Sequence, residues 1–245
     1  MDFDRIAELL QPFLAAPTTT DSALEHDRRP RESAILSEVQ LQQTSAYLDL
    51  LLHWNDRVNL TAVREPEQIV TRHFGESLFA ARHLFPSIPS GQPYDRAKDG
   101  LTGPRLMDFG SGAGFPGLPI KIWATQIELT LIESNQKKAT FLREAIRKLA
   151  LKSAVVFSAR AQGFAGQAET VTLRAVERFE NSLRTAMRLV APEGRLVLLI
   201  GESQVSQTEE LVPTFSWASP IPIPLSSSRV LMIGGARPTN RNQVD

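Results

Sequence analysis

A short apolar run leads into a glycine-rich turn near the middle of the chain: Leu106-Met107-Asp108-Phe109-Gly110-Ser111-Gly112-Ala113-Gly114-Phe115-Pro116-Gly117. Glycine has no side chain and tolerates positive φ, so glycines at alternate positions allow a sharp turn whose bare N–H groups can face a ligand. A second apolar run, Leu129-Thr130-Leu131-Ile132, ends in Glu133, where a carboxylate would hold a ribose diol. Together these features predict a site for a nucleoside cofactor.

Two ligands compete for this turn. Read from Gly112, the residues fit G-x-G-x-x-G, which is typical of dinucleotides whose pyrophosphate lies on a helix N-terminus. Read from Asp108, they fit acid-x-G-x-G-x-G, the form used for S-adenosylmethionine, which has no phosphate to place at a helix dipole. Pro116 and Pro119 remove two N–H donors that a pyrophosphate would need, so we favour S-adenosylmethionine. A tight strand–helix turn that binds nothing is the purely structural alternative.

Composition excludes several other kinds of chemistry. The 245 residues contain no cysteine, which excludes disulfides, thiolate metal ligands and a cysteine nucleophile. The four histidines, His26, His53, His73 and His83, lack acid or cysteine partners at ligand spacing, so we expect no metal site. The 27 basic and 27 acidic residues balance, which neither supports nor excludes a nucleic-acid partner. We find no membrane-length apolar run and no secretory signal pattern, and therefore expect a cytoplasmic protein without membrane contact.

The elements around the turn follow an alternating order. We expect a short helix over 1–14, a polar linker over 15–33, helices over 33–54 and 65–85, and a proline- and glycine-rich loop over 86–104. From 105 onward we expect strands at 105–109, 128–133, 154–158, 170–173 and 195–200, and helices at 117–123, 136–149 and 180–190, with Asn135 as an N-cap. This alternation predicts a doubly wound parallel sheet. Two final strands, near 215–223 and 229–233, have no helix between them and indicate an antiparallel edge.

Several segments resemble one protein family. His53-Trp54-Asn55-Asp56-Arg57-Val58-Asn59-Leu60-Thr61 resembles its WN-x-x-x-NLT signature, and Arg72-His73-Phe74-Gly75-Glu76-Ser77-Leu78 resembles its R-H-x-x-D-S-L segment. Gly114-Phe115-Pro116-Gly117 and the run from Glu133 through Lys137-Lys138 to Phe141-Leu142-Arg143 fit as well. From about Leu41 to Ile233 the chain is similar to the small-subunit ribosomal RNA guanine-N7 methyltransferase G family, also called glucose-inhibited division protein B.

The resemblance implies an α/β fold, the Rossmann-like class I S-adenosylmethionine-dependent methyltransferase fold, with a seven-stranded mostly parallel sheet and an N-terminal helical extension. It implies methyl transfer from S-adenosylmethionine to N7 of one guanine in 16S rRNA of the small ribosomal subunit. We expect a monomer. We divide the chain into a variable N-terminal segment (1–34), the helical extension (35–86), a proline- and glycine-rich loop (87–104), the methyltransferase domain (105–235) and a polar tail (236–245).

The motif and the resemblance together assign roles to individual residues. Cofactor contacts are predicted for Asp108, Gly110, Gly112, Gly114, Phe115, Glu133, Ala161, Gln162 and Arg174, with Ala161 and Gln162 flanking the adenine. Arg174, which matches the arginine of the family's S-R-A segment, is predicted to position the donor carboxylate or the RNA. No general base is expected, because guanine N7 has a free lone pair. RNA contacts are predicted for Asn59, Arg64, His73, Lys137 and Lys138.

The chain departs from the family pattern at three places. Leu173 replaces the serine of S-R-A, Ala168-Glu169 stands where the family has an aspartate, and Ile200 replaces the lysine of L-K-G at the end of the fifth strand. The lost lysine leaves one alternative open, an RNA-binding relic of the enzyme with weakened catalysis. The other alternative is an NAD-type oxidoreductase, which the G-x-G-x-x-G reading would favour.

Overall fold

The computed structural model describes residues 1–15, 34–86, 103–175 and 178–236. Most of the expected polar linker, the proline- and glycine-rich loop and the polar tail lie outside the described residues.

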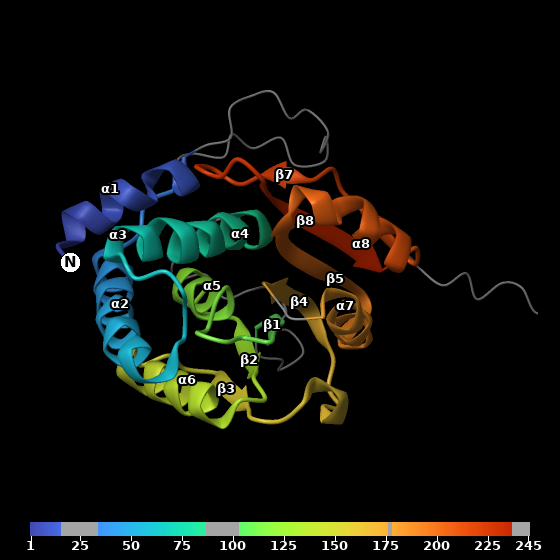
Figure 1. Ribbon diagram of the computed structural model, residues 1–245, viewed down its shortest axis with the longest axis horizontal. Helices are drawn as coiled ribbons and strands as arrows, with labels where there is room; N and C mark the ends of the chain where they lie inside the picture. Colours follow the sequence, from blue (N-terminus) through green and yellow to red (C-terminus); the bar gives the residue numbers. More distant parts are fainter. Residues whose placement is uncertain (16–33, 87–102, 176–177, 237–245) are drawn as a thin grey trace, which may run out of the picture.

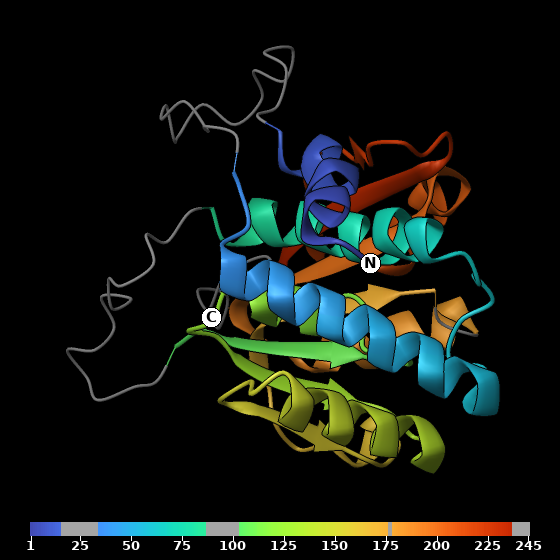
Figure 2. The same ribbon diagram turned by 90° about the vertical axis from the view of Figure 1, so that its left-hand side faces the viewer.

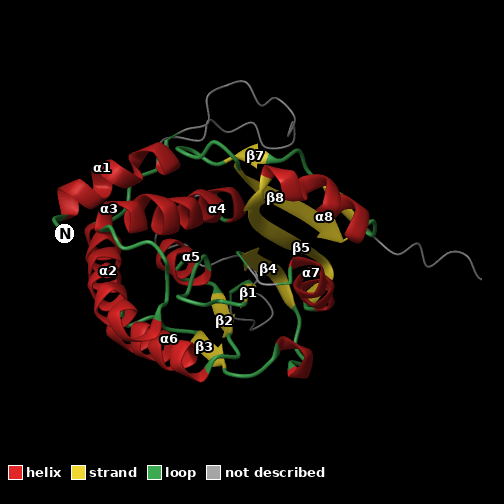
Figure 3. Cartoon of the chain, viewed as in Figure 1, coloured by secondary structure: helices red, strands yellow, loops and turns green. Residues whose placement is uncertain are grey.

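An eight-stranded sheet forms the centre of the structure (Figure 1, Figure 3). Seven strands run in the order β3-β2-β1-β4-β5-β8-β6, and the two-residue β7 pairs with β8 off this path. The neighbours among β1 to β5 pair in parallel, whereas β8 is antiparallel to β5 and β6. The expected mostly parallel sheet with an antiparallel edge is therefore confirmed. The strands are β1 (Arg105–Phe109), β2 (Glu128–Ile132), β3 (Ala154–Phe157), β4 (Ala168–Arg174), β5 (Val190–Gly201), β6 (Phe215–Trp217), β7 (Ile221–Pro222) and β8 (Arg229–Ala236).

Helices cover both faces of this sheet (Figure 1). On one side lie α4 (Glu76–Leu84), α5 (Gly117–Trp123) and α6 (Gln136–Lys148), with α1 (Phe3–Leu14) and α2 (Glu38–Val58) outside them. Figure 2 shows α2 crossing between α1 above and α6 below. On the other side lie α7 (Phe179–Arg188) and α8 (Val205–Leu211). The short elements are α3 (Pro66–Ile69), η1 (Val70–Gly75), η3 (Ala161–Gly163) and η4 (Glu202–Gln204).

Alternation along the central strands assigns each apolar side chain to one of two cores. In β5, Val197 and Leu199 join the cluster under α4 to α6, whereas Leu198 and Ile200 join the cluster under α7 and α8. Successive side chains of a strand point to opposite faces, so a parallel strand covered on both sides needs apolar residues throughout. The carboxyl ends of β1, β2 and β4 then meet at one edge of the sheet.

Local side-chain bonds set where the helices begin. Ser37 and Gln40 form a capping box at the start of α2, which therefore begins at Glu38, later than expected. The predicted N-cap Asn135 is confirmed, because its side chain accepts bonds from the backbone N–H groups of Lys137 and Lys138. No helix within the described ranges has the length and apolar character that a bilayer span requires.

Three elements differ from the expectations. The helix expected over 65–85 is interrupted by the π-helical segment η1, in which the Thr71 hydroxyl bonds to the carbonyl of Glu67. The strand expected over 215–223 is two short strands, and Pro220, which lies between them, has no N–H to donate to a ladder. The short helix α8 was not expected, since its sequence is mostly polar.

Candidate cofactor and substrate site

A cavity of about 650 Å³ opens at the carboxyl ends of the central strands. Its wall is formed by the residues that follow β1 and β2, by η3 with the residues just before it, and by one side of α7. The volume lies in the range of small-molecule sites. Four of the predicted cofactor residues line it: Gly110, Glu133, Ala161 and Gln162. Strand order thus brings together residues that are far apart in the sequence.

The glycine turn follows β1 in a conformation that other residues rarely adopt. Gly110, Gly112 and Gly114 have φ values of 66°, 56° and 88°. At Gly114 a Cβ atom would also lie 2.5 Å from Leu118 Cδ1 and from the Tyr47 hydroxyl oxygen, so a side chain cannot fit. Gly110 reaches the cavity, whereas Gly112 and Gly114 shape the turn behind it. Their direct contact with the cofactor stays a prediction.

Glu133 joins the glycine turn to the start of α6. Its Oε2 accepts a bond from the Gly112 N–H at 2.8 Å, and its Oε1 accepts one from the Asn135 N–H at 2.7 Å. A carboxylate has about four acceptor positions, so two remain for other donors. Because Glu133 also lines the cavity, it can hold a ribose diol while it fixes the turn.

Asp108 lies beneath the turn, outside the cavity wall. Its Oδ1 accepts a bond from the Thr172 hydroxyl at 2.8 Å, while its buried Oδ2 has no partner among the described residues. Burial raises the pKa of Asp108 to about 6. Asp108 supports the turn from below. It does not line the cavity, so its contact with the cofactor stays a prediction.

Phe115 also lies behind the cavity, in an aromatic cluster with the outer helices. Its ring stacks on Tyr47 at 5.3 Å and contacts His73 at 5.0 Å between ring centroids. The Tyr47 hydroxyl donates a hydrogen bond to the carbonyl of Ala113 in the glycine turn. Burial raises the pKa of Tyr47 well above its ordinary value, so the phenol stays a donor. Helix α2 therefore supports the turn.

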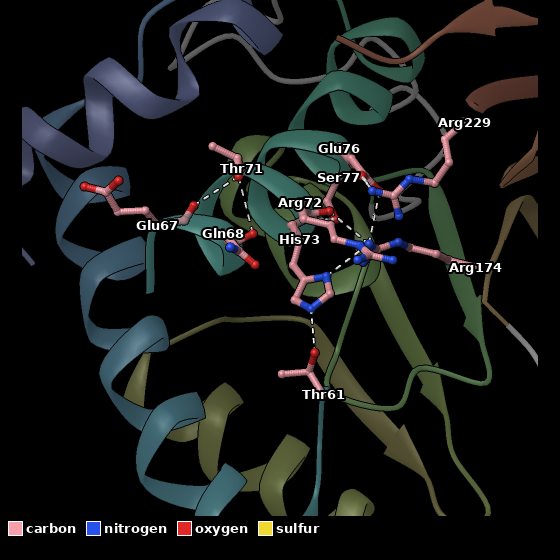
Figure 4. A network of polar contacts seen from close by, with 10 residues as sticks. All are labelled: Thr61, Glu67, Gln68, Thr71, Arg72, His73, Glu76, Ser77, Arg174 and Arg229. Atoms are coloured by element: carbon pink, nitrogen blue, oxygen red, sulfur yellow. Dashed lines mark hydrogen bonds and ion pairs between the residues drawn. The ribbon is translucent and has the colours of Figure 1, made fainter. Parts of the chain in front are cut away.

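Arg174, at the end of β4, forms the centre of a buried polar network (Figure 4). Its Nη2 donates to the carbonyl of Arg72 at 2.9 Å, to His73 Nδ1 at 3.0 Å and to Glu76 Oε2 at 3.0 Å. Glu76 also forms an ion pair with Arg229 of β8. Burial raises the pKa of Glu76 and lowers the pKa of Arg174. The network ties β4, α4 and β8 together. Arg174 does not line the cavity, so its predicted cofactor contact stays a prediction.

His73 is neutral in this network. Arginine can only donate, so Nδ1 is the acceptor and Nε2 carries the proton toward the Thr61 hydroxyl, 2.7 Å away. Burial and the neighbouring arginines lower the pKa of His73 to about 3. Its RNA contact stays a prediction, and a neutral imidazole would make it through a hydrogen bond or a ring contact and not through an ion pair.

The other predicted RNA residues lie at two further places. Asn59 ends α2 with a φ of 49°, and its side-chain oxygen accepts a bond from Arg64 at 3.1 Å. Lys137 and Lys138 lie in the first turn of α6, directly after Glu133 and Asn135. Their RNA contacts stay predictions.

Sequence reasoning missed several residues of the site. No role was predicted for Tyr47, although a buried tyrosine hydroxyl needs a partner and could have signalled one. Glu76 occupies the acidic position of the R-H-x-x-D-S-L segment, which could have signalled a role, whereas Arg229 joins the site only through tertiary packing. The arginines of α7 gave no sequence signal, because charged residues on a helix are usually solvated.

The replaced lysine position is buried. Ile200 is 4% exposed and packs in the apolar cluster under α7 and α8.

In the parts of the chain that the structure describes, no group of three or more His, Cys, Asp or Glu residues could hold a metal ion.

The sheet order, the glycine turn after β1 and the acid after β2 define the S-adenosylmethionine-dependent methyltransferase class. The ribosomal protein L11 methylase of Lactobacillus delbrueckii subsp. bulgaricus has this fold, with a TM-score of 0.53 and 9% identity over 68% of this chain and 80% of that chain. Residues 40–222 match the family model GidB, rRNA small subunit methyltransferase G. The chain belongs to this family.

Two curated relatives show the extent of the similarity. Ribosomal RNA small subunit methyltransferase G of Xanthomonas campestris pv. campestris (strain B100) is 40% identical over 157 residues, 63% of this chain and 66% of that protein. The protein of the same name from Xylella fastidiosa (strain 9a5c) is 34% identical over 203 residues, 81% of this chain and 88% of that protein. The first alignment thus spans just under two thirds of its relative's length.

Proposed function

We propose that this chain transfers a methyl group from S-adenosylmethionine to N7 of one guanine in 16S rRNA of the small ribosomal subunit. The observation that carries the proposal is the cavity at the carboxyl ends of β1 and β2, where Gly110 and Glu133 meet. Membership of the rRNA small subunit methyltransferase G family supplies the substrate.

The residues present fit this donor. The turn offers bare backbone at Gly110, and Glu133 keeps acceptor capacity for a ribose. Pro116 and Pro119 leave the N-terminal turn of α5 short of the N–H donors that a dinucleotide pyrophosphate would use. S-adenosylmethionine supplies a methyl group that its sulfonium sulfur already activates. The alternative NAD-type oxidoreductase is therefore disfavoured.

The chain's own contribution is orientation. Guanine N7 has an in-plane lone pair and needs no deprotonation, which agrees with a neutral His73 and a buried Asp108 outside the cavity. Holding two reactants in line can lower a barrier by roughly 7–11 kcal/mol. We propose that the residues Gly110, Glu133, Ala161 and Gln162 bind S-adenosylmethionine. We assign no residue a role in proton transfer.

Arg174 is assigned to positioning. All three of its hydrogen bonds leave from Nη2, so Nε and Nη1 have no acceptor within the described ranges. The N–H groups of Nε and Nη1 point in different directions, so each can donate a separate hydrogen bond to a carboxylate or phosphate oxygen. These free donors support contact with the donor carboxylate or with an RNA phosphate.

The test uses small ribosomal subunits from cells that lack this gene. Purified protein and labelled S-adenosylmethionine are added, and the 16S rRNA is mapped by mass spectrometry. One new N7-methylguanine is expected. Label at another atom, or no label, would contradict the proposal. In parallel, S-adenosylmethionine should raise the melting temperature and NAD should not.

The replacement of the family lysine by Ile200 supports a second candidate, RNA binding with weakened catalysis. In that case the protein would bind small subunits without the donor and transfer no label.

For the active enzyme we propose a cytoplasmic monomer, and sedimentation of the purified protein tests the monomer.

A further inference from the structure

A second hollow adjoins the cavity along α7. Its volume is about 400 Å³, and it shares Ala161, Gln162, Thr185 and Arg188 with the cavity. The two hollows therefore form one depression, which we call the α7 groove. It extends the donor site along the helix toward Arg105 at the start of β1.

The α7 groove is cationic. Four arginines line its first hollow, Arg160, Arg178, Arg184 and Arg188, against the single acid Glu133. Both oxygens of Glu133 already accept backbone hydrogen bonds. Arg184 pairs with the exposed Glu180 at 3.1 Å, and the other three arginines have no ion-pair partner among the residues that the structure describes.

The arrangement of α7 explains why these arginines face outward. Leu183 and Ala186 are fully buried against the sheet, as expected for an amphipathic helix with one apolar stripe. Arg184 and Arg188 are one turn apart, so they lie side by side on the exposed face that borders the groove. The helix thus presents a row of guanidinium groups beside the donor site.

This charge does not suit the methyl donor. S-adenosylmethionine carries a sulfonium, an ammonium and a carboxylate, so it is itself a net cation. Excess positive charge around its pocket would repel it. The same charge suits a polyanion, because arginine binds phosphate oxygens with two parallel N–H groups.

We propose that the α7 groove binds the phosphate backbone of the RNA substrate beside the target base, through Arg184 and Arg188. The inference rests on the proposed function, since it takes the substrate to be RNA. It adds a binding surface on α7, on the opposite side of the sheet from α6, whose basic residues the sequence had singled out.

The test replaces Arg184 and Arg188 together by glutamine, which keeps a polar side chain and removes two charges. The control is Arg147→Gln with Lys152→Gln, which removes two exposed charges near the amino ends of the strands. For each protein we would measure the Kd for 16S rRNA across a salt series, the KM for small subunits and the Kd for S-adenosylmethionine.

The α7 variant is expected to bind RNA about tenfold more weakly at physiological salt. The slope of log K against log salt should fall by about 1 to 2, as for one or two lost phosphate contacts. Affinity for S-adenosylmethionine should stay within twofold, and the control should behave as wild type. An RNA affinity and a salt slope equal to those of the control would overturn the inference, as would a loss confined to donor affinity.

The same measurements distinguish failure of the proposed function from failure of the inference about the α7 groove. If the wild-type protein binds 16S rRNA but transfers no methyl group, the proposed function fails while the RNA-binding comparison still decides the role of the groove. If it methylates normally and the α7 variant is unaffected, only the groove is rejected.

Discussion

Arg174 makes three hydrogen bonds through one nitrogen, and this asymmetry determines what the residue can do. Nη2 is committed to Arg72, His73 and Glu76, which holds the guanidinium plane in place. The N–H groups of Nε and Nη1 are left for a ligand. A side chain that is already fixed loses little conformational entropy when a ligand binds.

Arg174→Ala is expected to lower methyl transfer about 100-fold or more, because a fixed donor to the reacting groups is lost. The fold should persist, since Glu76 keeps its ion pair with Arg229. Arg174→Lys keeps the charge and loses the planar guanidinium donors, so its activity should fall between those of the alanine variant and the wild type. Label transfer and thermal denaturation measure the two effects. Full turnover in the alanine variant would reject the assignment.

Asp108 makes stability depend on pH. Its folded pKa of about 6 lies above the ordinary value, so the folded state holds the proton more tightly than the unfolded chain does. Below about pH 4 the carboxyl is protonated in both the folded and the unfolded state, so its burial costs no free energy of ionisation. Stability is therefore lost as the pH rises from about 4 to 6, where the buried carboxyl must ionise.

Asp108→Asn should remove this dependence. The amide is neutral and can donate to the Thr172 hydroxyl, so the free energy of unfolding at pH 7 should rise by about 3 kcal/mol. Urea unfolding at pH 4, 5, 6 and 7 measures the difference. A variant whose stability falls between pH 4 and 6 as steeply as wild type would show that another group is responsible.

At the scale of elements, local patterns predicted most of the sheet and its turn. Strand β1 and helix α5 begin and end at the expected residues, since apolar alternation and the glycine turn mark their ends. The turn's positive φ values follow from its glycines alone. Periodicity could not reveal η1, because the hydroxyl bonds of Thr71 depend on local carbonyl geometry and not on apolar spacing.

The candidate site was predicted less completely than the fold. Gly110, Glu133, Ala161 and Gln162 line the cavity as the motif and the resemblance required. The support from Tyr47 could not be read from the sequence, because a hydroxyl on α2 meets Ala113 only after the helix packs on the turn. Such contacts depend on tertiary packing between distant segments.

Tyr47→Phe tests this support between elements. It removes the bond to the Ala113 carbonyl and keeps the ring that stacks on Phe115. We expect affinity for S-adenosylmethionine to fall by up to about tenfold, the equivalent of one hydrogen bond, with little change in the KM for RNA. Trp54→Phe, on the same helix but packed against Phe141, is the control. If the two variants bind S-adenosylmethionine with equal affinity, Tyr47 does not position the turn for the donor.

At the scale of the whole molecule, all the N-terminal helices, which from here on are called the extension and include α1, share one apolar core with the sheet. A single cluster includes Phe13 of α1, Tyr47 of α2, Leu78 of α4 and Leu131 of β2. Phe13 also fills the space above Gly75, where a Cβ atom would lie 2.4 Å from its ring. The extension and the sheet should therefore unfold together.

Phe13→Ala is expected to lower the free energy of unfolding of the entire described structure by about 3–5 kcal/mol. Calorimetry should show one transition at a lower temperature. Two separate transitions, with the second at the wild-type temperature, would mean that the sheet is stable without the extension.

The Glu133 carboxylate accepts hydrogen bonds from the turn after β1 and from the Asn135 N–H just before α6, and it also lines the donor cavity. Binding of the donor and the order of the backbone in the turn are therefore thermodynamically coupled. The amide of Gly112 becomes a reporter. Its hydrogen-exchange rate should change when the methyl donor binds, even in the absence of any ribosome.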